Sequence, residues 1–318
     1  MEFTNLPDEV IVHVLKNSSP STVAKFRRMN RRMNDLINHH RLGRPVVDEF
    51  SVTIRTAPSR SAPMGRIQLK KNSNQMKRKV MFTMKRKNKH HHLVEEENVE
   101  GPSNPSESQI IEKTLKTVKL ANRVSFDGIN VDSSFHKMVT SRWNDLSSVN
   151  NLTFTLCRMN LTEEELTSIL LKTGLNSLTL DFCHFHTDVI NDKILRLLPE
   201  LECLRIQPRS PLYLAELTDN TLRAWSQKPP RTIALYNCIT SFTIQGIVDF
   251  VKVVPNTEAE WDFGRVLPST NSAEALLSLT MTPGVTVNVS DDYRSRRIQV
   301  DRLKSKIAFN LLTEEIFT

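Results

Sequence analysis

The 318-residue chain has few glycines, cysteines and aromatic residues, and it lacks a long apolar run. With only 8 glycines, sandwiches and barrels that need many tight turns are disfavoured, and a helix-rich or mixed α/β fold is expected. No stretch approaches the roughly 18 apolar residues of a membrane-spanning helix, and the start of the chain lacks the pattern of a secretion signal. We therefore expect an intracellular protein, cytoplasmic, nuclear or both.

Catalytic and metal-binding motifs are also missing. The four cysteines have no C-x-x-C or other metal-type spacing, and a reducing compartment would leave them as thiols. The chain has no G-x-S-x-G, P-loop, G-x-G-x-x-G or H-E-x-x-H motif. We therefore expect no enzyme activity, no cofactor and no metal site.

Acidic residues are absent from Ser51 to Val94, where twelve Lys and Arg residues gather. The net charge of +8 therefore arises in this segment, and the rest of the chain is net negative. Residues 56–112 are rich in Pro, Ser, Asn and Lys and show little periodic hydrophobicity. They predict a basic, low-complexity linker that is largely disordered.

The basic segment also supplies an alternative function. KRKV at 77–80 and KRKNK at 85–89 could be nuclear-import signals or could contact phosphates, as in a nuclear nucleic-acid-binding protein that uses residues 55–89. Phe82 has no aromatic neighbours, so a base-stacking platform is not indicated. The interpretation that we prefer is a solvated linker.

Residues 1–44 show the pattern of three short helices. Ser19 and Pro20 begin the second helix, and Asn30 caps the third. Apolar residues form a stripe on each helix, and three helices this short cannot bury all of them. Part of the stripe is expected to contact a partner.

The segment LPDEVIVHVLKNSSPSTVAKFRRMNRRMNDLI, residues 6–37, resembles the F-box, a docking module of cullin-type ubiquitin ligases. The resemblance covers the Leu-Pro-Asp-Glu opening, the Ser-Pro break and the basic and apolar third helix. It is closest to the F-box families expanded in nematodes. Met33 departs from the pattern, because many members have an aromatic residue there.

The resemblance implies a substrate-recognition adapter that binds a Skp-type linker, and through it a cullin, without catalysis in this chain. Each implied contact could equally belong to the core of a small bundle, so the inference depends on the set. The family's linker-contacting positions would fall at Leu6, Pro7, Val10, Ile11, Val14, Leu15, Pro20, Val23 and Phe26.

Residues 113–318 repeat the template L-x-x-L-x-L-x-x-C/N, in which alternate apolar residues predict a short strand. Intervals of 28, 26, 26, 29 and 28 residues separate the repeats, within the range of about 20–29 residues for leucine-rich repeats. Val285 and Val287 could supply a last strand. The residues that mark the register are Val124, Leu152, Leu178, Leu204, Ile233 and Trp261.

Helix-like stretches over 161–173, 189–199 and 243–255 alternate with these strands, and Thr162 and Glu165 have the spacing of a capping box. Strand plus helix, repeated, predicts an α/β solenoid with a curved parallel sheet. Residues 45–55 would form a strand that connects it to the N-terminal module. The copies resemble the cysteine-containing leucine-rich repeats that often follow an F-box.

Cys157, Cys183 and Cys238 occupy one repeat position and should be buried thiols. A zinc site with His184 and His186 is the alternative, but stacked repeats bring these cysteines together without a metal.

The exposed strand positions are the candidates for binding a target protein. Each could also be an ordinary solvated residue. The candidates are Thr153, Thr155, Thr179, Asp181, Arg205 and Tyr236.

Overall fold

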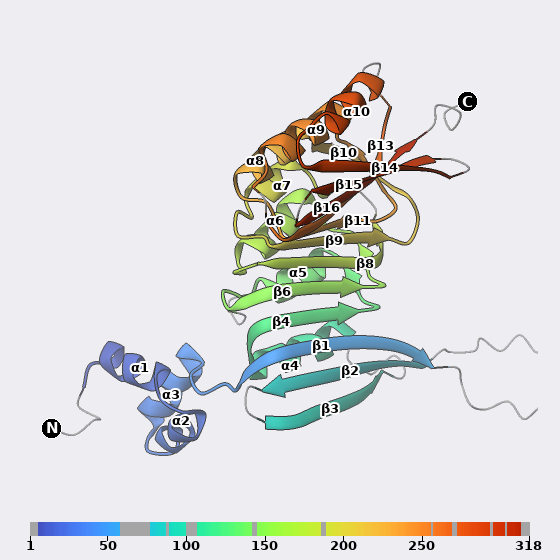
Figure 1. Ribbon diagram of the computed structural model, residues 1–318. Helices are drawn as coiled ribbons and strands as arrows, with labels where there is room; N and C mark the ends of the chain where they lie inside the picture. Colours follow the sequence, from blue (N-terminus) through green and yellow to red (C-terminus); the bar gives the residue numbers. More distant parts are fainter. Residues whose placement is uncertain are drawn as a thin grey trace, which may run out of the picture.

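The computed structural model describes residues 6–57, 77–86, 89–99, 107–141, 145–185, 189–255, 257–268, 272–292, 295–302 and 304–312. An N-terminal bundle of three helices lies beside a large mixed sheet that is backed by helices (Figure 1). The bundle consists of α1 (Asp8–Lys16), α2 (Pro20–Arg27) and α3 (Arg31–His40). In these ranges no helix combines the length and apolar character needed to cross a membrane.

The bundle has its own small hydrophobic core and well-defined helix starts. The side-chain oxygen of Asn30 accepts a hydrogen bond from the Met33 amide at 2.8 Å, which confirms the predicted cap of α3. Ser19 caps α2 in the same way, ahead of Pro20. The core consists of Ile11, Val12, Leu15, Val23, Met33, Leu36, Ile37 and Leu42, with Leu6 and Phe26 packed against it.

The strands follow one another across a single sheet in the order β14-β15-β16-β13-β11-β9-β8-β6-β4-β1-β2-β3. From β1 to β13, and on to β16, neighbouring strands are parallel. These strands are β1 (Val46–Ala57), β4 (Lys119–Asp127), β6 (Val149–Thr155), β8 (Ser177–Phe185), β9 (Cys203–Pro208), β11 (Thr232–Leu235), β13 (Ala259–Val266) and β16 (Ser305–Leu312).

Both ends of the sheet are antiparallel, and the end formed by residues 285–302 differs from the parallel sheet predicted for the repeat region. The ends are formed by β2 (Lys77–Arg86) and β3 (Lys89–Val99) on one side, and by β14 (Val285–Asp292) and β15 (Ser295–Arg302) on the other. Four short strands lie off this path: β5 (Asn130–Val131), β7 (Arg158–Met159), β10 (Leu212–Thr218) and β12 (Cys238–Ser241).

The sequence interval between successive register marks is the number of residues that separates paired positions on neighbouring parallel strands. Leu152 pairs with Val124 and with Leu178, and Leu204 pairs with Leu178 and with Ile233, which itself pairs with Trp261. All of these register marks are buried. They therefore form one continuous apolar row across the sheet, because side chains at the same register position of adjacent strands lie on the same face.

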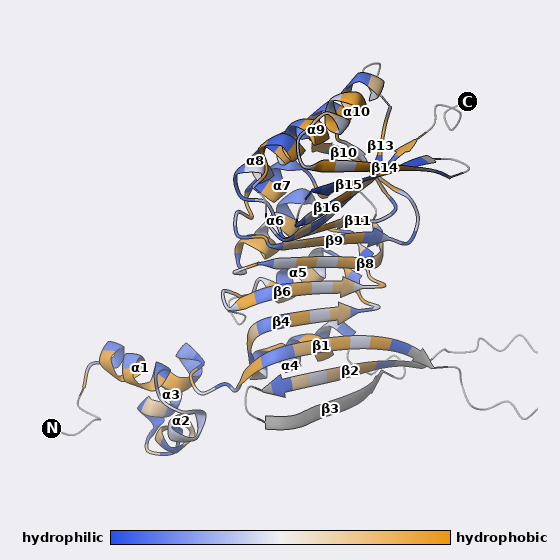
Figure 2. Cartoon of the chain, in the orientation of Figure 1, coloured by the Kyte–Doolittle hydropathy of each residue, from blue (hydrophilic) through white to orange (hydrophobic). Residues whose placement is uncertain are grey.

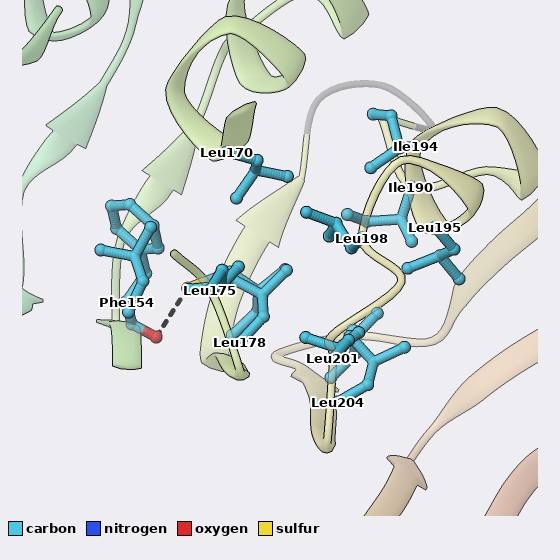
Figure 3. Close-up of a cluster of buried hydrophobic side chains, with 14 of the residues drawn as sticks. Phe154, Leu170, Leu175, Leu178, Ile190, Ile194, Leu195, Leu198, Leu201 and Leu204 are labelled. Atoms are coloured by element: carbon cyan, nitrogen blue, oxygen red, sulfur yellow. Dashed lines mark hydrogen bonds between the residues drawn. The ribbon is translucent and has the colours of Figure 1, made fainter. Parts of the chain in front are cut away.

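Helices cover the face of the sheet that carries this row. Leu170 of α6 and Ile194 and Leu195 of α7 lie near Leu178 and Leu204 (Figure 3), and Figure 2 shows the alternating hydropathy along the strands. The helices of this part of the chain are α4 (Glu107–Thr117), α5 (Ser133–Val139), α6 (Glu163–Leu171), α7 (Asp192–Arg196), α8 (Asp219–Gln227), α9 (Ile244–Val253) and α10 (Ser272–Thr280).

The prediction of a largely disordered linker over 56–112 is wrong for residues 77–86. Val80, Phe82 and Met84 alternate along β2 and are buried, and β2 pairs with β1 from Lys77 to Lys85. The intervening Lys and Arg residues hid this alternation in the sequence. Residues 89–99 and 107–112 also form regular structure, in β3 and α4, and 58–76, 87–88 and 100–106 lie outside the described residues.

Successive helices are tied together at their N-termini. The acidic first residue of one helix accepts a hydrogen bond from the residue that caps the next helix, an arrangement that we call the cap ladder. Its pairs are Asn191 Nδ2 to Glu163 Oε2 (3.0 Å), Thr218 N to Asp192 Oδ1 (2.8 Å) and Thr243 N to Asp219 Oδ1 (2.8 Å). Each carboxylate thus serves two helix N-termini, where negative charge is favourable.

The absence of a side chain at Gly246 makes room for the Asp219 carboxylate in the last step of the cap ladder. A Cβ atom at this position would overlap the Asp219 carboxylate. Replacing a helical glycine by alanine ordinarily stabilises by about 1 kcal/mol. Here we expect Gly246→Ala to lower the free energy of unfolding by about 2 kcal/mol, because the overlap forces the carboxylate away from Thr243. Chemical denaturation measures the change.

A double-mutant cycle tests the cause. In an Asp219→Ala background the obstacle is gone, so Gly246→Ala should become neutral or stabilising. An equal loss of stability in both backgrounds would contradict this role of Asp219.

Candidate functional site

The N-terminal bundle leaves apolar side chains open to water. Val10 and Val14 lie one turn apart on α1 and are 43% and 40% exposed, and Met29, after α2, is 55% exposed. The remaining apolar residues of α1 face the bundle core. Three helices with so small an interior leave apolar residues exposed, and the exposed ones among the nine predicted linker-contacting positions are here called the bundle patch: Pro7, Val10, Val14 and Pro20.

The nine positions implied by the F-box resemblance separate into three groups in the structure. The exposed ones are those of the bundle patch. Leu6 and Phe26 are half-buried against the bundle core. Ile11, Leu15 and Val23 are fully inside that core, so their side chains serve the fold of the bundle.

An electrostatic clasp holds the start of α1 in place beside this patch. The Arg32 guanidinium of α3 donates to the Asp8 carboxylate at 3.0 Å through Nε, and to the backbone oxygen of Leu6 at 2.9 Å. Charge-assisted hydrogen bonds from one guanidinium to two neighbouring residues restrict the geometry of the segment that carries them. The clasp therefore presents residues 6–10 in one orientation.

The second candidate site is the face of the sheet opposite the helices, here called the open face. Thr153, Thr179 and Arg205 pair with one another across β6, β8 and β9, and Thr155 pairs with Asp181 in the next row. All five are half-buried on this face, and Tyr236 is exposed just beyond β11. The structure thus brings the six predicted target-binding residues onto one surface.

Charged groups on the open face are organised around Arg205. Its Nε lies 2.9 Å from Asp181 Oδ1, its Nη2 donates to Gln207 Oε1 at 3.2 Å, and its guanidinium lies 5.7 Å from the centroid of the Tyr236 ring. Further along, Arg297 of β15 contacts the carboxylate of Asp262 at 3.1 Å. The sequence analysis missed Arg297, because β15 joins the sheet through β16, and no repeat in the sequence indicates that β16 pairs with β13.

Leu156 and Phe182 are further surface residues that the sequence analysis missed. They occupy equivalent positions just before Cys157 and Cys183, and they are 58% and 45% exposed. Both have φ of 53°, a left-handed conformation that costs a non-glycine residue about 1–2 kcal/mol. Asn237, just before Cys238, has the same conformation with a φ of 56°, so the left-handed turn belongs to the repeat, whereas the exposure of a bulky apolar side chain at this position is particular to Leu156 and Phe182. Their place in the template, directly before the cysteine, was the available signal.

The three cysteines of the repeat position are buried, as predicted. The thiols of Cys157 and Cys183 donate to the carbonyl oxygens of Phe126 and Phe154, each at 3.4 Å, which are one strand back. Burial raises the pKa of the Cys238 thiol to about 12, and the nearby Asp262 acts in the same direction. The Cys238 thiol is therefore a poor nucleophile and a poor metal ligand at neutral pH.

Cys203 differs from the other three cysteines, because it is half-buried on the open face at the start of β9. In the native chain we expect maleimide to modify Cys203 at least about 100-fold faster than the other cysteines, since only accessible thiolate reacts. Intact-mass spectrometry over time should therefore show one rapid addition. Cys203→Ser should abolish it, and rapid labelling that persists in this variant would contradict the placement of the cysteines.

The part of the chain that the structure describes has no group of three or more His, Cys, Asp and Glu side chains placed to hold a metal ion. His184, from the alternative zinc site, is exposed, whereas the Cys183 thiol beside it in sequence points to the Phe154 carbonyl. His186 lies outside the described residues.

Comparison with known families identifies the N-terminal module. The F-box domain family matches residues 3–45, which include α1, α2 and α3. A search of curated proteins found no match to the chain. Residues 3–45 thus form an F-box domain, followed by a mixed α/β body. F-box domains generally act as substrate-recognition adapters of cullin-type ubiquitin ligases, which they join through a Skp-type linker.

Proposed function

We propose that the chain is a substrate receptor of a cullin-type ubiquitin ligase, in which the F-box binds the Skp-type linker and the sheet domain binds the target. The observation that carries the proposal is the bundle patch on a matched F-box. Val10 and Val14 stay exposed although the chain has a large sheet against which it could bury them. Burying such residues against a partner is the largest favourable term available to this surface.

We further propose that the body is a leucine-rich-repeat-like solenoid of the kind found in nematode-type F-box families. The nearly constant spacing of the register marks and the single row that they form support this interpretation. The body would carry out no chemistry. It would hold a target close to a ubiquitin-conjugating enzyme on the same assembly, because proximity converts a bimolecular transfer into an effectively unimolecular one. Such a ligase would act in the cytoplasm, the nucleus or both.

The open face is the proposed contact for the target protein. Leu156 and Phe182 supply exposed apolar anchors, and the cluster of Asp181, Arg205 and Tyr236 extends from β8 across β9 to the residue after β11. Aromatic and Arg residues are the ones that most often dominate the energy of protein interfaces. The burial of Phe82 and its neighbours in β2 gives part of the basic segment a structural role, so we do not propose nucleic acid as its ligand.

Calorimetric titration of the full chain with a purified Skp-type linker tests the proposal. We expect saturable one-to-one binding with a Kd below about 1 µM, which corresponds to about 8 kcal/mol. No saturation at linker concentrations of about 100 µM would overturn the proposed function.

A further inference from the structure

A hollow lies where the F-box bundle joins the sheet. Its walls come from the ends of α1 and α3, from the loop after α1 and the first residue of α2, from the segment after α3 that leads into β1, from the first residue of β4 and from the loop before β6. The two modules are also bonded here, because the Lys119 amide donates to the Pro45 carbonyl at 3.0 Å. The hollow is therefore lined by both modules.

The side chains around this hollow are strongly unbalanced in charge. Lys16, Arg41, Arg44 and Lys119 are cationic, and Asp145 is the one carboxylate among the lining residues. Asp145 already serves other groups, since its Oδ2 lies 3.5 Å from Lys119 Nζ and its Oδ1 accepts from the hydroxyl of Ser147 at 2.7 Å. The lining as a whole is therefore net positive.

Helix dipoles account for only part of this charge. Lys16 ends α1, where a cation is favoured by the carbonyl groups of the last turn. Arg44 and Lys119 lie outside helices, so this explanation does not extend to them. Arg44 Nη1 donates to the backbone oxygen of Val118 at 3.1 Å, which holds its guanidinium at the junction.

The position of Arg44 is electrostatically unfavourable for a cation. Burial lowers the pKa of its guanidinium, and the charge of Arg41 lowers it further, whereas Asp145 acts in the opposite direction. A second anion in the hollow would offset both effects. Arginine forks match the oxygens of a phosphate group bidentately, which makes them suited to this ligand.

We propose that the hollow binds a small phosphate-bearing anion between Arg41, Arg44 and Lys119. The ligand would contact the segment that ends the F-box on one side and β4 on the other, so it would stabilise one orientation of the F-box relative to the sheet. An adapter needs this orientation to be fixed if its target is to reach a distant enzyme. Pro20 borders both this hollow and the bundle patch, but Arg41, Arg44 and Lys119 lie outside the patch, so the binding of the anion and the binding of the linker can be measured separately and either can fail without the other.

Calorimetric titration of the full chain with inorganic pyrophosphate, at constant ionic strength set by chloride, tests the site. We expect saturable binding, weakened at least about 10-fold by Arg44→Gln, because a charge-assisted hydrogen bond is lost. Arg209→Gln, which removes an exposed arginine after β9, is the matched control and should change nothing.

A second variant, Asp145→Asn, distinguishes the loss of a ligand contact from a folding defect, because it is expected to strengthen binding. The amide oxygen can still accept from Ser147, but the competing negative charge is gone, so pyrophosphate should bind about 3-fold to 10-fold tighter. A misfolded variant cannot gain affinity. The proposal is overturned by the absence of saturable binding, by an equal loss in Arg44→Gln and Arg209→Gln, or by unchanged or weaker binding in Asp145→Asn.

Discussion

The Val10→Asp, Val14→Asp double variant should bind the Skp-type linker about 100-fold more weakly than the native chain and should unfold at the same denaturant concentration. The two valines are one turn apart and exposed, so a charge at each leaves the fold unchanged but must be desolvated when the linker covers it. Calorimetric titration gives the affinity, and chemical denaturation gives the stability.

A matched variant separates the bundle patch from exposed apolar residues in general. Leu171→Asp, Val253→Asp places two charges at the exposed ends of α6 and α9 in the sheet domain, and it should bind the linker like the native chain. Equal binding by both double variants would contradict docking at the bundle patch. Leu15→Asp is a poor test, because Leu15 is in the bundle core and its replacement unfolds the module that is being tested.

Asp192→Ala should lower the free energy of unfolding of the chain by about 3 kcal/mol, although Asp192 is only half-buried. Its carboxylate begins α7 and accepts from the amide and the hydroxyl of Thr218 and from the hydroxyl of Thr221 at 2.6 Å. Removing it leaves the N-terminus of α8 without a partner from the preceding repeat. Denaturation followed by tryptophan fluorescence measures the change.

Two comparisons show whether the cap ladder is the cause. Asp192→Asn retains an acceptor oxygen and should cost only about 1 kcal/mol. Asp249→Ala removes an exposed carboxylate that accepts from Gln245 within α9, so a change below about 0.5 kcal/mol is expected. If Asp192→Ala and Asp249→Ala were equally mild, successive repeats would not depend on shared caps.

The parallel part of the fold could be predicted, because its strands are local and periodic. Leu152, Leu178 and Leu204 recur at nearly constant intervals, and each interval contains one strand and the segment that returns to the next. The capping box of Thr162 and Glu165 is also confirmed, with both hydrogen bonds formed. Such features depend on residues a few positions apart, so the sequence alone contains them.

The antiparallel ends of the sheet could not be predicted in the same way. Val300 pairs with Ile307 across a hairpin, and Ile307 pairs with Trp261, which is 46 residues earlier in the chain. Nothing local specifies that β16 rather than β14 lies beside β13. At the other end, the cationic neighbours of Phe82 made a sheet strand resemble a charged linker.

The bundle patch was predicted as a set, but not residue by residue. Val10 and Ile11 both belong to the broad apolar stripe of α1. Because successive residues of a helix are about 100° apart, the two side chains point in different directions, and only Ile11 is buried in the core. Which edge of the stripe faces the core depends on how α1 packs against α3. The cap ladder was hidden for a similar reason, because it joins residues that neighbour each other only after the repeats have stacked.

Hydrogen-deuterium exchange of the full chain, with and without a saturating Skp-type linker, tests the central claim most directly. Docking through the F-box predicts slower amide exchange over residues 6–28, in α1 and α2, and unchanged exchange over β6, β8 and β9, whose open face stays available for a target. Protection confined to those strands, with the first two helices unaffected, would contradict the account.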